Sequence, residues 1–429
     1  MRIRLSVVSV VILLGLAPCV SQGAEEKKPI TLTFFHMNTV PGSQKVITDA
    51  IAAFEEKHPG IRVRETIVGW GDAHSQFMIS LVAKRAPDIV MLGGTWATEF
   101  TRLKAFVPIE EFLPAEMKAN FLPNAFIAVR DGEHLYGLPW EGATWGMFYR
   151  TDLFEQAGLD PEKPPGNWAE LLAAAKALTR DTNGDGRIDQ WGIGFPAKGW
   201  EPADFWLPFM WQAGCRVVEL REGKWRGVMS DEAGQTATRF FVDLVRTHRV
   251  TPESIVGMDW EAVKNGFVAG RFAMMFNGMW VIKVIRESAP QLEGKWATAP
   301  YPAGPTGIRA ALGYPNTLHI TQQSQHKKEA WQFMELLYSG RPSRLDQYSI
   351  EVCSLNWTKN FVSLPYSNDP LRKPFVESMA FSHYPPASPK YEVFRERILN
   401  PGLQAMILGQ RPVRESLELF DREFNALHP

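Results

Sequence analysis

A tryptophan at the end of a predicted buried strand is the clearest chemical signal in the sequence. Residues 272–276 form an apolar run with Gly270 before it and Gly278 after it, which is typical of a strand covered on both faces. A helix is predicted to begin at Gly278 and to carry Trp280 at its N-terminus, beside backbone N–H groups that need oxygen acceptors. A flat apolar face next to such donors suits a sugar ring, which has C–H faces and hydroxyl edges. Packing in the core is the alternative role for Trp280, as for any single tryptophan.

Other candidate ligand-binding residues follow predicted strands in the same way. The chain has 15 tryptophans, and several of them stand where strands end. Because the carboxyl ends of strands in an open α/β sheet meet at one crevice, we expect these side chains to converge. The candidate ligand-binding residues are His36, Asn38, Trp70, Asp72, Thr95, Trp96, Trp140, Glu141, Trp145, Asn277, Gly278, Trp280 and Tyr314. The tryptophans expected to pack in the interior instead are Trp168, Trp191, Trp225 and Trp331.

An enzymatic role has no comparable support in the sequence. The chain contains no G-x-S-x-G, H-E-x-x-H or Walker motif, and no G-x-G-x-x-G follows a predicted strand. Glu141 and Asp72 could form the carboxylate pair of a glycosidase, but a chain with 47 acidic residues always offers such a pair. A binding protein without catalytic residues is therefore the preferred interpretation. A secreted carbohydrate-active enzyme, such as a glycosidase or a lyase, is the alternative.

Length, composition and the first residues predict an exported protein with two domains. A chain of 429 residues is too long for one core, and 45% hydrophobic and 22% charged residues are ordinary for a globular protein. A formal net charge of -1 gives no footprint for nucleic acid. Arg2 and Arg4 precede an apolar run at 5–16 and then small residues, which predicts a signal peptide over residues 1–24. An uncleaved membrane anchor is the weaker alternative, because the apolar run is short for a bilayer span.

The remaining chain alternates predicted strands and helices, which favours α/β sheets that are largely parallel. Asn167 followed by Glu170 is a capping-box pattern, and Asp259 is predicted to cap the helix that ends before Gly270. Cys215 and Cys353 follow the signal peptide, and either a disulfide or two separate buried thiols fits an exported protein. The predicted strands near the N-terminus are residues 30–35, 61–68 and 88–92.

A series of motifs in a fixed order gives the chain a family resemblance. The motifs are IRVRETIVGW (61–70), APDIV (86–90), YGLPWEGATWGMFYRTDLFEQAGLD (136–160), NWAELLAAAKALT (167–179), FVAGRFAMMFNGMW (267–280) and HKKEAWQFMELLYS (326–339). With these motifs in this order, the sequence resembles the family 1 extracellular solute-binding proteins, the sugar-capturing components of ABC importers. The resemblance covers almost all of the chain that follows the signal peptide.

The resemblance implies two lobes around a hinged cleft, with three chain crossings between them. Mapped onto this sequence, the crossings fall at Pro139–Gly142, Arg309–Tyr314 and Ser339–Arg344. Lobes joined by several strands can close by hinge bending. The implied division places residues 25–140 and 313–340 in lobe I, and residues 141–312 and 341–429 in lobe II.

The function that the resemblance implies is capture of a carbohydrate, an oligosaccharide by expectation, and its delivery to the membrane permease of an ABC transporter. We expect a monomer in the periplasm, or a lipid-anchored or extracellular protein where there is no outer membrane. A glycerol phosphodiester or an acidic oligosaccharide is the alternative cargo. Such a ligand would need a cation at the cleft, and Arg271 and Lys283 are the candidates.

Residues 181–189, DTNGDGRID, match the first part of a calcium-binding EF-hand loop. The twelfth position, normally Glu, is Gly192, which excludes a true EF-hand. Some members of the resembled family hold a structural calcium ion in such a loop, although Gln190 stands where they have Glu. A metal-free turn rich in Asp and Gly is the alternative. The calcium ligands implied by the resemblance are Asp181, Asn183, Asp185 and Asp189 through their side chains and Arg187 through its carbonyl.

Overall fold

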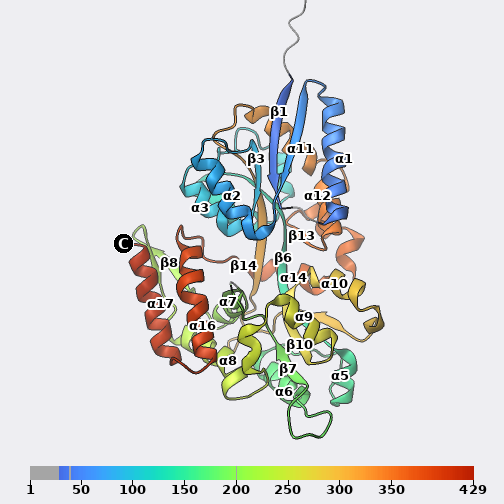
Figure 1. The fold of residues 1–429 in the computed structure, drawn as a ribbon, viewed down its shortest axis with the longest axis vertical. Coiled ribbons are helices and arrows are strands. Elements are labelled where there is room, and N and C mark those ends of the chain that lie inside the picture. Colours follow the sequence, from blue (N-terminus) through green and yellow to red (C-terminus); the bar gives the residue numbers. More distant parts are fainter. Residues whose placement is uncertain (1–28, 38–39, 200) are drawn as a thin grey trace, which may run out of the picture.

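The chain folds into two α/β lobes, drawn one above the other in Figure 1. The computed structural model describes residues 29–37, 40–199 and 201–429. The α/β class and the two-lobe architecture expected from the sequence are confirmed. The predicted signal peptide and Asn38 lie outside the described residues.

The elements alternate along the chain as the sequence pattern indicates. The strands are β1 (Ile30–His36), β2 (Ile61–Ile67), β3 (Ile89–Leu92), β4 (Arg130–Asp131), β5 (His134–Leu135), β6 (Leu138–Tyr149), β7 (Trp191–Gly194), β8 (Val218–Arg221), β9 (Lys224–Gly227), β10 (Phe272–Gly278), β11 (Ala297–Ala299), β12 (Ala311–Ile320), β13 (Leu355–Asn356) and β14 (Ser382–His383). The α-helices are α1 (Pro41–Lys57), α2 (Trp70–Val82), α3 (Gly94–Arg102), α4 (Ala115–Asn120), α5 (Thr151–Gln156), α6 (Trp168–Leu178), α7 (Pro202–Gln212), α8 (Glu232–Arg246), α9 (Trp260–Val268), α10 (Val281–Ser288), α11 (Lys327–Tyr338), α12 (Arg344–Glu351), α13 (Lys359–Val362), α14 (Lys373–Ser378), α15 (Tyr391–Phe394), α16 (Asn400–Ile407) and α17 (Val413–Leu427).

Lobe I, the upper one in Figure 1, is built on a sheet with the strand order β2-β1-β3-β12-β6. Strand β1 runs parallel to β2 and β3, whereas β12 runs antiparallel to β3 and β6. The strands predicted at 30–35, 61–68 and 88–92 are confirmed as β1, β2 and β3. Helix α1 packs against α11 and α12 beside this sheet. Strand β1 begins at the top of lobe I in Figure 1, so the carboxyl ends of the parallel strands point toward lobe II.

One long strand, β6, belongs to the sheets of both lobes. Residues 138–144 pair with β12 in lobe I, and residues 145–149 pair with β10 in lobe II. All twelve residues of β6 are buried, as expected for a strand that is covered along its whole length. The predicted crossing at Pro139–Gly142 lies within this shared strand. The exact division of the chain between the lobes stays a prediction.

Lobe II, the lower one, contains the strand order β6-β10-β7, in which β10 and β7 are parallel. The apolar run 272–276 is confirmed as part of β10, and all seven residues of that strand are buried. Both helix caps predicted in this lobe are present. The Asn167 side chain accepts from the Glu170 amide at 3.0 Å, and the Asp259 side chain accepts from the Ala262 amide at 3.0 Å.

The two cysteines in the described part of the chain are free and buried. Cys215 Sγ lies 3.4 Å from the Val228 carbonyl oxygen, whereas Cys353 Sγ lies 3.7 Å from the Met279 carbonyl oxygen. Of the two alternatives left open by the sequence, the structure therefore has separate thiols. Over residues 29–37, 40–199 and 201–429, no helix has the length and apolar character needed to cross a membrane.

Candidate ligand-binding site

Trp280 stands where β10 ends and α10 begins, in the N-cap position of that helix. Its indole ring folds back over the end of the strand and lies against Gly278. A Cβ atom at Gly278 would overlap the ring atoms of Trp280. Only glycine leaves room for this arrangement. The helix itself begins at Val281 rather than at Gly278.

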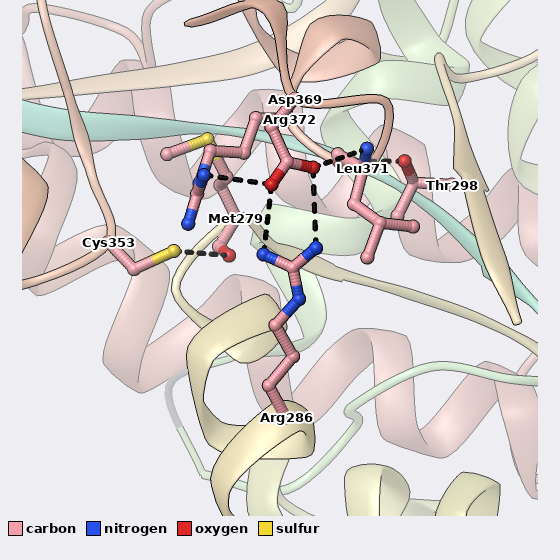
Figure 2. Close-up of polar contacts among 7 residues, drawn as sticks. All are labelled: Met279, Arg286, Thr298, Cys353, Asp369, Leu371 and Arg372. Carbon is pink, nitrogen blue, oxygen red and sulfur yellow. Dashed lines mark hydrogen bonds and ion pairs between the residues drawn. The ribbon is translucent and has the colours of Figure 1, made fainter. Parts of the chain in front are cut away.

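Helix α10, which follows Trp280, is held to the C-terminal part of the chain by an ion-pair network (Figure 2). The Asp369 carboxylate accepts from Arg286 Nη1 and from Arg372 Nη1, both at 2.9 Å, and from the Leu371 amide at 2.9 Å. Hydrogen bonds to charged groups are stronger than those between neutral groups. The network therefore fixes the helix on which the position of Trp280 depends.

Trp280 belongs to an aromatic cluster formed by Trp145, Trp260, Trp280 and Tyr314. The ring centroids of Trp145 and Trp280 lie 5.2 Å apart with an interplanar angle of 83°, and those of Trp260 and Trp280 lie 6.4 Å apart at 79°. The Tyr314 ring lies 6.1 Å from Trp145. These residues come from β6, α9, β12 and the start of α10. Edge-to-face contacts of this kind stabilise a cluster and leave other ring faces for a ligand.

Lobe I reaches this cluster through the first turn of α3. The hydroxyls of Thr95 and Tyr314 lie 2.6 Å apart. A Cβ atom at Gly94 would collide with the Pro315 carbonyl oxygen and the Tyr384 hydroxyl, so glycine permits close approach. The ring of Tyr384, which follows β14, lies 5.9 Å from that of Tyr314. Residues from separate parts of the chain thus meet between the lobes.

A buried charge cluster, formed by Asp204, Glu392 and Arg395, lies close to Tyr314. Arg395 Nη1 lies 3.3 Å from Asp204 Oδ1, and Arg395 Nη2 lies 2.7 Å from Glu392 Oε2. Asp204 is 1% exposed and Arg395 is 5% exposed. Burial raises the pKa of the Asp204 carboxyl to about 6, although the Arg395 charge opposes this shift. Burial, followed by the charge of Glu392, also raises the pKa of Tyr314, which links the two clusters.

Several polar atoms around the buried charge cluster make no hydrogen bond to another described residue. A buried polar group without a partner costs about 1–3 kcal/mol, so native proteins rarely retain several at one place. The charges of the cluster act on the hydroxyls of Tyr301, Tyr384 and Tyr391, so these hydroxyls lie near it, where a hydroxyl-rich ligand would pair with them. These atoms are Asp204 Oδ2, Glu392 Oε1, Ser388 Oγ and the hydroxyls of Tyr301, Tyr384 and Tyr391.

A third buried carboxyl, that of Glu201, lies beside the aromatic cluster. Both of its oxygens accept from the Trp260 amide, at 3.2 and 3.1 Å. Burial, together with the nearby charge of Asp204, raises the pKa of Glu201 to about 8, although the hydrogen bond from the Trp260 amide opposes this shift. Glu201 therefore connects the first turn of α9 with the start of α7, where Asp204 lies.

The structure brings together part of the predicted ligand-binding set. Thr95, Trp145, Trp280 and Tyr314 contribute side chains to the interlobe site described above. Nearby, the Asn277 side-chain oxygen accepts from the amide of Gly278 at 3.0 Å.

Trp70, Asp72 and Trp96 lie on lobe I, in the first turns of α2 and α3. The rings of Trp70 and Trp96 are 5.9 Å apart, and Trp70 is 43% exposed. The rings of Trp70 and Trp96 therefore offer an aromatic surface for a ligand on the lobe I side.

Three predicted residues lie in the interior instead. His36 Nε2 lies 3.1 Å from Glu65 Oε1, and Glu141 Oε1 accepts from the Asn316 amide nitrogen at 2.7 Å. Trp140 is 1% exposed, and its ring contacts are with Tyr338 and Tyr348. We leave these three residues out of the proposed site. Asn38 lies outside the described residues.

The sequence reasoning missed the residues of the buried charge cluster and the tyrosines around it. Asp204 lies in the first turn of a helix, and Tyr384, Tyr391, Glu392 and Arg395 lie in the C-terminal segment. Tyr384 follows only the short strand β14, which the sequence pattern does not predict, and the others follow no predicted strand. The tryptophans assigned to the interior do pack there, since Trp168 and Trp331 are buried and Trp191 and Trp225 pack against the core.

The loop at 181–189 is exposed and organised by its own hydrogen bonds. Asp181 Oδ1 accepts from the Gly184 amide at 2.7 Å, and Asp181 Oδ2 accepts from the Gly186 amide at 2.7 Å. Asp189 accepts from the Thr182 amide and hydroxyl. Among the described residues, no three His, Cys, Asp or Glu side chains are gathered as around a metal ion. The side-chain oxygens have the type and order along the chain that calcium prefers. The calcium site stays a prediction.

A separate open hollow of about 710 Å³ lies on lobe I, lined by residues of α4, α13 and the turn between α11 and α12. Its lining includes Phe121, Tyr338, Arg341 and Asp346, and no residue of the aromatic cluster or the buried charge cluster. The unpartnered polar atoms and the aromatic faces are elsewhere. We therefore place the candidate site between the lobes.

The fold is shared with solved structures of sugar-binding proteins. An ABC transporter solute-binding protein of Thermotoga lettingae, bound to α-D-tagatose, is similar with a TM-score of 0.77 and 24% identity, over 92% of this chain and 99% of that one. The sugar-binding protein MalE of Xanthomonas citri is similar with a TM-score of 0.80 and 23% identity, over 92% of this chain and 96% of that one.

Sequence comparison places the chain in a family of binding proteins. A Brucella abortus relative, named only as a binding protein, is 29% identical over 288 residues, which is 67% of this chain and 66% of the relative's length. The sequence pattern of the bacterial extracellular solute-binding proteins matches residues 39–340, well over half of the chain. This protein therefore belongs to the bacterial extracellular solute-binding protein family.

Proposed function

We propose that this protein captures a carbohydrate between its two lobes and delivers it to the membrane permease of an ABC transporter. The observation that carries the proposal is the interlobe site, where aromatic faces lie beside buried polar atoms without protein partners. Sugar rings combine C–H faces with hydroxyls that donate and accept, which is the chemistry that both groups need. The relation to sugar-binding proteins of the same fold supports the proposal.

Capture of this kind needs no covalent step. A ligand that contacts Trp145 and Trp280 on one side and the first turn of α3 on the other gains contacts only when the lobes are together. The ligand then favours the closed form by its differential affinity for that form. The contact between α3 and α15 joins the lobes at the edge of the site.

Export and delivery to a permease are part of the proposal, and membership of the family supports them. The N-terminal pattern of Arg2, Arg4 and the apolar run is that of a secretory signal. We propose a monomer that works in the periplasm, or outside the cell where there is no outer membrane, with permease subunits as its protein partners.

The two alternatives raised by the sequence have less support. Arg271 is exposed, and Lys283 Nζ donates to the Glu351 carbonyl oxygen at 2.7 Å, so neither offers a cation to an anionic ligand in the interlobe site. Arg395 is already flanked by two carboxylates. A hydrolytic enzyme has less support because the family consists of binding proteins. No observation at the interlobe site favours a reaction.

A thermal-shift screen of the mature protein against neutral mono- and oligosaccharides tests the proposal. Ligands that bind only the folded state raise its melting temperature, and isothermal titration of the hits gives the affinity. We expect at least one sugar to bind and to be recovered unchanged by chromatography. Conversion of the sugar into a product would contradict a pure binding role.

A further inference from the structure

The charges that face the interlobe site are unbalanced. The buried charge cluster has two carboxylates, Asp204 and Glu392, against one guanidinium, Arg395. Glu201 lies on the side of the aromatic cluster, but its pKa of about 8 keeps its carboxyl protonated near neutral pH, so it adds no charge to this count. Among the described residues, its oxygens accept from the Trp260 amide. Lys198, whose charge acts on Glu201, is paired with Asp259 at 3.2 Å.

Groups on the lobe I side of the site do not balance the excess negative charge. His74 lies 2.9 Å from Glu99, and the charges of Glu392 and Glu396 also act on it. One titratable base there faces three carboxylates from two lobes. The charges that act on His74 from both lobes are therefore negative.

The unpartnered carboxylate oxygens of the cluster also need hydrogen-bond donors. Ionised Asp204 and Glu392 are acceptors only, and each retains an oxygen that makes no hydrogen bond to a described residue. Neutral hydroxyls would pair with these oxygens but would leave the buried negative charge uncompensated, which is costly away from water. An ammonium group supplies three donors and the missing positive charge together. The faces of Trp145, Trp280 and Tyr314 would add cation–π attraction.

We propose that the interlobe site selects a sugar with a protonated amino group, which pairs with Asp204 and Glu392 beside the aromatic cluster. This inference rests on the proposed function and names the class of sugar. Binding of such a group would favour the ionised form of Asp204, whose pKa burial otherwise raises to about 6.

The test uses matched sugars that differ in one substituent. Glucose, galactose and mannose are each compared with the 2-amino sugar, the N-acetylated amino sugar and the uronate of the same ring, by thermal shift and titration at pH 6.5. Simple amines with a pKa of about 8 are protonated at this pH. For the ring that fits, the amino sugar is expected to bind at least about tenfold more tightly than the neutral sugar, since one charge-assisted hydrogen bond in a buried site has that effect. The uronate is expected to bind most weakly.

Two variants assign the preference to the proposed residues. Glu392→Gln keeps the shape and one acceptor but removes the charge, so the tenfold preference for the amine is expected to fall to near parity. Asp49→Asn removes a carboxylate from an exposed pair with Lys45 on α1 and is expected to change nothing. The ranking measured on the unaltered protein tests the proposal even if a variant does not fold.

Each outcome separates this inference from the proposed function. If the neutral or N-acetylated sugar binds as tightly as the amino sugar, the inference is wrong and the proposed function stands. If the preference persists in Glu392→Gln, the assignment to the buried charge cluster is wrong. If no member of the panel binds at millimolar concentration, and neutral oligosaccharides also fail, the proposal of a sugar ligand is itself contradicted.

Discussion

The hydroxyl of Thr95, in the first turn of α3, lies 2.6 Å from the hydroxyl of Tyr314 on the strand that joins the lobes. Thr95 is 6% exposed, so this hydrogen bond is shielded from water. The contact ties lobe I to the aromatic cluster through a single pair of oxygens. It gives the closed arrangement a bond that opening of the lobes would expose or break.

Tyr314→Phe removes this bond and keeps the ring against Trp145. A typical hydrogen bond contributes about 1 kcal/mol, so we expect sugar affinity to fall about fivefold. Titration calorimetry measures the affinity, and X-ray scattering with and without ligand measures closure. Unchanged affinity would mean that the bond has no part in closing.

Trp280→Ala removes the ring that folds over Gly278. Central aromatic residues of binding sites commonly contribute 2 kcal/mol or more, so we expect affinity to fall at least about thirtyfold. The melting temperature of the free protein should change little, because Trp280 is half-buried. Trp225→Ala, in the hairpin β8–β9 of the same lobe, is the control and should bind normally. Equal titrations for both variants would exclude Trp280 from the site.

Glu201 should make the protein less stable as the pH rises. Its pKa is about 8 in the folded state, above the usual value of 4.5, because burial disfavours the charged form. Between these values the folded state holds a proton that the unfolded state has lost, so stability falls with rising pH. Glu201→Gln should flatten the decline in melting temperature between pH 5 and pH 8. Parallel curves for the two proteins would show that Glu201 does not titrate in this range.

The loop at 181–189 is predicted to bind calcium weakly. Its side-chain oxygens are exposed, and sites in extracellular modules have dissociation constants of about 10⁻⁴–10⁻³ M. Millimolar calcium should raise the melting temperature of chelator-treated protein, and Asp185→Ala should abolish that increase. Sugar affinity should be unaffected by the ion. Calorimetry without a calcium signal would leave the loop as a metal-free turn.

The fold followed from the sequence because local patterns determine the elements. The buried run 272–276 and the caps at Asn167 and Asp259 depend on nearest neighbours along the chain, and the structure contains all three. Family resemblance supplied the arrangement of the lobes.

The site could be predicted only in part, because it depends on contacts between distant segments. Asp204 and Arg395 are 191 residues apart, and no spacing along the chain indicates that they form an ion pair. Trp140 was predicted to bind the ligand but does not lie at the site. It stands in the shared strand β6 like Trp145, yet its ring packs into lobe I. Strand periodicity places neighbouring side chains on opposite faces, but it does not say which face the other lobe covers.

Because β6 and β12 are hydrogen-bonded to each other where they pass between the lobes, they form one paired ribbon rather than two independent tethers. Sliding of one half past the other would break that ladder, whereas flexing or twisting of the ribbon preserves it. The permitted motions are therefore bending and twisting of the ribbon, which change the distance between the lobes. The width of cargo that the protein accepts is then set by how far this ribbon can bend.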